Sequence, residues 1–173
     1  MRNLPEAREV GTGTIGPVKV IGHTADVAVG VLDEFVLLLW RRRIVPEGVR
    51  WTKEAFAKLA LKEDRKFVFL TAVVPGCDIN TPTEVRKDVA ALLKTYEWQL
   101  ACAAIVFENN GFGMTIVRSV MTAIHMASRS RFPNAVFGSV ESALAWMAAH
   151  TESNDVRLEP ARIVDAFGHL RTL

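Results

Sequence analysis

The chain has 173 residues, half of them hydrophobic, which fits one globular domain with some excess for terminal tails. Its 21 basic and 19 acidic residues leave a net charge of +2, so the composition gives no reason to expect a nucleic-acid partner. The longest apolar run, residues 35–40, falls far short of the roughly 20 residues that a membrane helix needs. We therefore expect a soluble, cytoplasmic protein without membrane insertion.

The first part of the chain predicts an arm followed by a β-hairpin. Residues 1–16 are polar and rich in Gly and Thr, and we expect an arm or an early edge strand there. They contain a GxGxxG string, but no hydrophobic strand precedes it and no helix opens at it, so we reject a dinucleotide site. Two β-rich runs, 27–32 and 35–40, flank a short Asp-Glu turn, and residues 17–22 are a candidate third antiparallel strand.

Helices and strands alternate through the middle of the chain. The apolar spacing predicts a helix that begins at Pro46, and residues 66–74 form a strongly apolar strand pattern. Thr81, Pro82 and Glu84 have the spacing of a capping box, with Thr81 as the N-cap of the next helix. That helix ends near Trp98, and we expect this tryptophan to be the exposed one of the four.

The second half of the chain has a continuous apolar strand pattern at its start. Residues 101–107 carry no charge, which predicts a strand that is covered on both faces. A turn leads to a long apolar helix over 111–129, and a short strand over 135–137 precedes a helix capped by Ser139. A short terminal helix over 160–170 is marginal alone, so it must dock on its own domain or on a second copy.

This order of elements predicts an α/β fold. The sheet is expected to be mainly parallel with right-handed crossovers, flanked by helices, with the antiparallel hairpin at one edge. We divide the chain into an arm over 1–16, an α/β domain over 17–150, and a linker with a short helix over 151–173.

Few residues are arranged for catalysis or metal binding. The histidines are scattered and the two cysteines form no metal pattern, so we expect no metal site. Ligands usually bind at the carboxyl ends of parallel strands, but the loops 75–83 and 108–113 contain no basic residue. We therefore expect neither an enzyme nor a bound cofactor. A small-molecule or active-site pocket near Cys77 and Asp78 is an alternative.

Two clusters have both a structural and a functional interpretation. The three arginines 41–43 suit a solvated strand end, or a site for an anion or an acidic partner. In the predicted helix 111–129 the methionines suit core gaps, whereas Phe112, Met114 and Met121 also suit a partner-binding rim. Arg118 is a charge within that apolar segment, and a surface-facing arginine is the simpler explanation.

Three segments together resemble the STAS and SpoIIAA-like family. They are the VLLLW strand before a helix that starts with Pro-Glu, the FVFLTAVV strand before a capped helix, and the closing RFPNAVFGSVESALAWM. The resemblance implies a small α/β domain that lacks catalytic activity and binds partner proteins in signalling or assembly. Some members are switched by phosphorylation of a Ser or Thr. The family's Asp-Ser-x-Gly motif is absent here, and Thr81 and Thr83 are the hydroxyls nearest to the switch position.

We therefore predict a non-enzymatic bacterial protein-interaction domain that acts in signalling regulation or complex assembly. Its working surface is expected at the first turns of the helices over 81–97 and 111–129. A self-associating structural subunit, held together by the apolar helix and residues 160–173, is the main alternative. The candidate partner-binding residues are Thr83, Phe112, Met114, Arg118 and Met121, and the candidate phosphorylation sites are Thr81 and Thr83.

Overall fold

The computed structural model describes residues 17–62, 64–108 and 131–173 of the chain. Within these ranges six strands form one sheet in the order β1-β2-β3-β4-β5-β6. They are β1 (Lys19–His23), β2 (Val27–Leu32), β3 (Phe35–Trp40), β4 (Phe67–Val73), β5 (Leu100–Phe107) and β6 (Asn134–Phe137). The first three strands pair antiparallel and β3 to β6 pair parallel. The predicted α/β fold, with its antiparallel edge, is confirmed.

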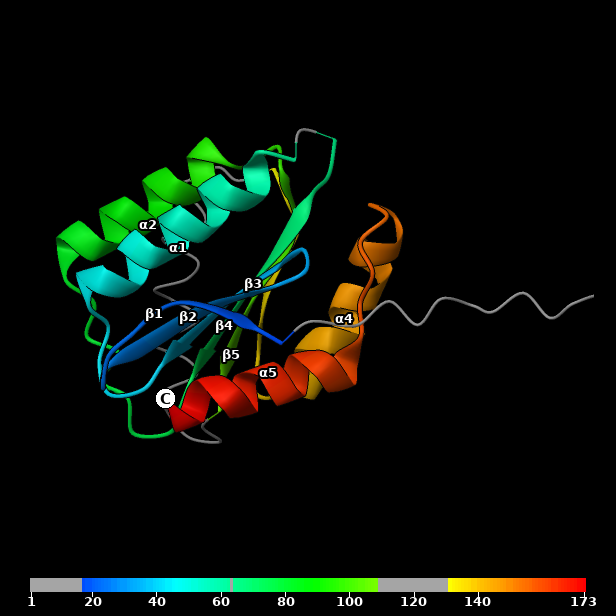
Figure 1. The fold of residues 1–173 in the computed structure, drawn as a ribbon. Coiled ribbons are helices and arrows are strands. Elements are labelled where there is room, and N and C mark those ends of the chain that lie inside the picture. The colour runs from blue at the N-terminus through cyan, green and yellow to red at the C-terminus, as the bar shows by residue number, and fades with distance from the viewer. Residues whose placement is uncertain (1–16, 63, 109–130) are drawn as a thin grey trace, which may run out of the picture.

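Helices cover both faces of the sheet (Figure 1). The described helices are α1 (Pro46–Ala60), α2 (Thr83–Thr95), α4 (Val140–Glu152) and α5 (Pro160–Thr172). α1 and α2 lie side by side on one face, and α4 and α5 lie on the other. Ser139 caps α4 as predicted, because its hydroxyl accepts a hydrogen bond from the Ser142 N–H at 3.2 Å. α4 continues to Glu152, so the linker begins later than the sequence predicts.

Each face of the sheet has its own hydrophobic core. On the α1/α2 face, Phe56 packs edge-on against Phe67 and Phe69, with ring centroids 4.9 and 5.1 Å apart. On the other face, Met147 of α4 and Phe167 of α5 are buried in a second hydrophobic core. Every residue of β4 is buried, which explains why its sequence shows no polar alternation.

The terminal helix α5 docks on its own domain. It lies against β2 and β3 and buries Ile163, Phe167 and Leu170 in the core. The apolar face of α5 therefore packs against its own domain. The sequence had left open docking on the same domain or on a second copy.

Candidate functional site

The carboxyl ends of β3, β4 and β5 meet at one edge of the sheet, here termed the carboxyl edge. The loop after β4 crosses to the loop after β3, since the Asp78 N–H donates to the Arg42 carbonyl at 2.8 Å. Arg43 and Asp78 also form a short parallel bridge. This edge is the usual ligand site of an open α/β sheet, and it holds the predicted Cys77/Asp78 loop.

The arginines 41–43 are largely engaged in contacts within the domain. Arg43 Nε lies 3.1 Å from Asp26 Oδ2. The Arg41 guanidinium donates to the Thr24 carbonyl at 3.1 Å and to the Leu170 carbonyl in the last turn of α5. Burial lowers the pKa of the Arg41 guanidinium from its ordinary value. Arg41 thus joins the end of β3 to the β1–β2 turn and to α5, and the cluster is not a set of three free cations.

Both cysteines hold their thiols protonated at neutral pH. Cys77 is half-buried, and burial, followed by the carboxylates of Asp78 and Asp26, raises its thiol pKa to about 11. Cys102 is fully buried in β5, where desolvation raises its thiol pKa to about 12. The thiolate is the nucleophilic form of cysteine. The alternative pocket near Cys77 and Asp78 therefore contains a thiol in its unreactive form.

The predicted capping box at the start of α2 is wrong. The helix begins at Thr83, Pro82 is its N-cap, and no side chain caps it. The Asp78 carboxylate instead accepts the backbone N–H two residues further on at 2.9 Å, which shapes the preceding loop as an Asx turn. Thr81 still belongs to this loop, and its hydroxyl donates to the Ile79 carbonyl at 3.0 Å. Thr81 thus bonds within the loop, and α2 begins two residues after it.

Thr83 is the predicted site residue that the structure places most openly. It is exposed in the first turn of α2, and its hydroxyl accepts a hydrogen bond from Arg86 Nη2 at 3.1 Å. The other candidate partner-binding residues, Phe112, Met114, Arg118 and Met121, lie outside the described residues. Whether the predicted surface comes together stays a prediction for those positions.

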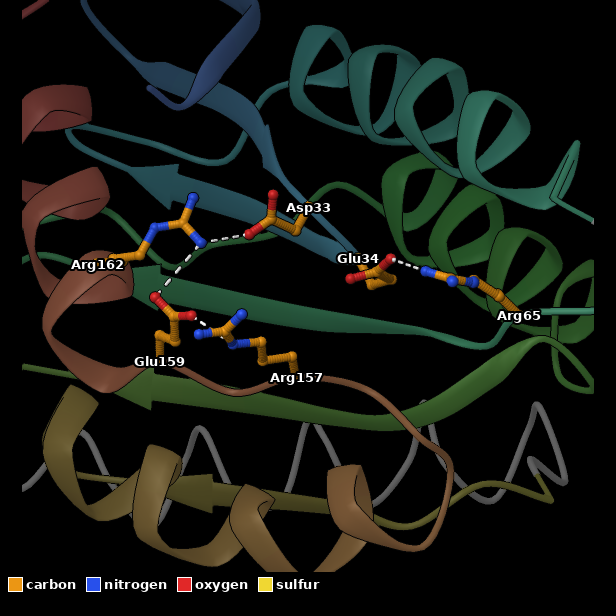
Figure 2. Close-up of polar contacts among 6 residues, drawn as sticks. All are labelled: Asp33, Glu34, Arg65, Arg157, Glu159 and Arg162. Atoms are coloured by element: carbon orange, nitrogen blue, oxygen red, sulfur yellow. Dashed lines mark hydrogen bonds and ion pairs between the residues drawn. The ribbon is translucent and has the colours of Figure 1, made fainter. Parts of the chain in front are cut away.

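The opposite edge of the sheet, here termed the amino edge, carries a network of ion pairs (Figure 2). Arg162 of α5 lies 2.5 Å from Asp33 in the β2–β3 turn and 3.6 Å from Glu159. The neighbouring turn residue, Glu34, points away toward Arg65, at 3.1 Å. The two acids of the predicted hairpin turn therefore bind different elements, one on each side of the sheet.

Two large apolar side chains are exposed at the same edge. Trp98, which follows α2, is 65% exposed, as the sequence predicts from its place at a helix end. Leu61, at the end of α1, is 82% exposed. Helical spacing could have indicated Leu61, because it lies on the side of the helix opposite to Ala55, Phe56 and Leu59. These residues are the functional candidates that the structure adds.

No family model, curated protein or solved structure matches the chain. Across residues 17–62, 64–108 and 131–173, no group of three acidic, histidine or cysteine side chains is placed to hold a metal ion. None of the helices in those ranges is long and apolar enough to cross a membrane.

Proposed function

We propose that this chain is a non-catalytic protein-interaction domain that acts in signalling regulation or complex assembly and binds through the first turn of α2. The proposal rests on a contrast at the carboxyl edge between loops that bind each other and a helix start that is exposed. Its loops bind each other through Arg43, Asp26 and Asp78, whereas Thr83 and Glu84 project into solvent beside them. An exposed helix start next to a rigid edge suits docking by a partner.

The chemistry of the carboxyl edge supports binding over catalysis. A nucleophilic cysteine needs a lowered thiol pKa, and that of Cys77 is raised to about 11 by its burial and its acidic neighbours. Asp26 is held in an ion pair with Arg43 at 3.1 Å, so it is engaged in closing the loop. These groups have structural partners that account for their positions.

Phosphorylation at Thr83 is a fitting means of control. A phosphate there would lie at the N-terminus of α2, where negative charge is favourable. Arg86 already contacts the Thr83 hydroxyl at 3.1 Å and would pair with the added charge. Thr81 is half-buried and its hydroxyl is hydrogen bonded to a carbonyl, so Thr83 is the better of the two candidates.

A photo-crosslinking residue at position 83, in the organism that makes the protein, tests this proposal. The matched control is position 53, where Lys53 is exposed on α1. We expect a defined partner to be captured from position 83 and not from position 53. We also expect the full chain with Thr83→Arg to lose affinity for the purified partner. Capture of the same proteins from both positions would contradict the proposed surface.

A further inference from the structure

Trp98 is held in place at the amino edge while most of its ring stays in solvent. The guanidinium carbon of Arg131 lies 4.7 Å from the ring centroid. The next residue, Gln99, accepts the Phe67 N–H at 2.9 Å, which ties this segment to β4. A cation above an aromatic ring is attracted to its face, which favours this orientation of the indole. Less ordering entropy is then lost when a ligand covers it.

A cation precedes each of the two strands that neighbour β5. Neighbouring strands lie about 4.8 Å apart. Lys66 precedes β4, Trp98 precedes β5 and Arg131 precedes β6, in that order across the sheet. Lys66 and Arg131 are both exposed and form no ion pair with the described residues.

The acids near the ring are already largely compensated. Glu97 is only 7% exposed and pairs with Lys94 at 2.8 Å. In the turn between α1 and β4, Arg65 pairs with Glu34 at 3.1 Å. The charged group that contacts the ring among the described residues is the Arg131 guanidinium.

We propose that Trp98, Leu61, Arg131 and Lys66 form a docking surface for an acidic segment of a partner protein that carries an apolar anchor residue. The anchor would cover the indole and Leu61, since aromatic side chains supply much of the binding energy at protein interfaces. Carboxylates beside the anchor would pair with Arg131 and Lys66. The inference rests on the proposed function and adds a second binding surface, at the edge of the sheet opposite to the first turn of α2.

Selection from a random peptide display library against the full chain tests the chemistry of this surface. We expect enriched peptides to combine acidic residues with an apolar one. Their affinity should fall by about tenfold or more in Trp98→Ala and in Arg131→Glu, the range of an interface hot spot. The controls are Val164→Ala, an exposed apolar side chain of α5, and Lys53→Glu on α1, and both should bind like the wild type.

Two results would overturn the inference. One is enrichment of neutral or basic peptides, and the other is equal affinity of acidic peptides for the wild type and Trp98→Ala. Binding to anionic vesicles that is lost in Trp98→Ala, without any acidic peptide being enriched, would also overturn it in favour of a lipid surface. The proposed function fails separately, when a partner captured from position 83 is unaffected by Thr83→Arg.

Discussion

The two edges of the parallel sheet are built differently. At the carboxyl edge the loops fasten to one another, through the Asp78 N–H on the Arg42 carbonyl and through Arg43 on Asp26. At the amino edge the ion pairs tie the hairpin turn to its neighbours, but Trp98 and Leu61 remain exposed. Among the described residues, the loops at the carboxyl edge, where α/β sheets usually bind ligands, are thus joined to each other, whereas the amino edge exposes two large apolar side chains.

The residues at the carboxyl edge form contacts within the domain, whereas Trp98 and Leu61 at the amino edge are largely exposed to solvent. An arginine or aspartate at a strand end is explained once its partner within the domain is found. Trp98 is 65% exposed and lies beside Arg131, which forms no ion pair with the described residues, so packing among those residues does not explain its position. Large apolar side chains that stay exposed, such as Trp98 and Leu61, are candidates for a binding surface.

The largest expected effect concerns α5, which connects the two edges. Its first turn meets Asp33 through Arg162, and its last turn accepts a hydrogen bond from Arg41. Replacing the buried Phe167 by alanine should lower the free energy of unfolding by about 3–5 kcal/mol, measured by urea denaturation. Val164→Ala, on the exposed side of the same helix, should lower it by less than about 1 kcal/mol. Equal losses in the two variants would mean that α5 is not docked as described.

Alkylation of Cys77 tests how closed the carboxyl edge is. With its thiol pKa raised to about 11, Cys77 should react with iodoacetamide at pH 8 roughly 100-fold more slowly in the folded than in the unfolded chain. A Cys102→Ala background isolates the signal, and Asp78→Asn should accelerate the reaction only slightly because burial is the larger cause. If Cys77 in the folded chain reacts as fast as in the unfolded chain, its thiol is not buried as described.

The same pKa shift predicts how stability changes with pH. Folding raises the Cys77 pKa, so above about pH 8.5 the folded state retains a proton that the unfolded state has lost. This group should leave stability unchanged at lower pH and reduce it as the pH rises toward about 11. Cys77→Ser should flatten that part of the profile, and an unchanged slope would contradict the assignment.

The smallest expected effect lies in the ion pairs of the amino edge. Asp33 and Arg162 are 2.5 Å apart but are 50% and 20% exposed, so solvent screens them. A double-mutant cycle of Asp33→Asn and Arg162→Gln should give a coupling of about 0.2–1 kcal/mol that shrinks in high salt. Asn suits this position because Asp33 has a φ of 52°, which Asn tolerates better than most residues. A coupling free energy that does not change with salt concentration would mean that Asp33 and Arg162 are more buried than described.

Much of the fold could be predicted because its strands are continuous apolar runs. β2 and β3 begin and end at the residues that the sequence indicates, and α1 begins at Pro46 as predicted. The capping box failed because Asp78, several residues earlier, shapes the loop before α2. Local spacing does not show whether a threonine side chain bonds within its own loop or to the helix that follows.

The sites were harder to predict because their contacts are distant in sequence. Arg41 donates to the Leu170 carbonyl across 129 positions, and the sequence alone predicted a solvated strand end there, with an anion or acidic-partner site as the alternative. Trp98 could be expected at the surface from its place at a helix end, but its contact with Arg131 required the order of β5 and β6.

The most direct test of the account is the affinity of the full chain for the partner captured from position 83. The dissociation constant should be measured for the wild type, for Thr83→Arg, and for Lys53→Glu as the control. If the chain works as a binding domain through the first turn of α2, Thr83→Arg should weaken binding by about tenfold or more, while Lys53→Glu leaves it unchanged. Equal affinity of all three proteins would contradict the proposed function.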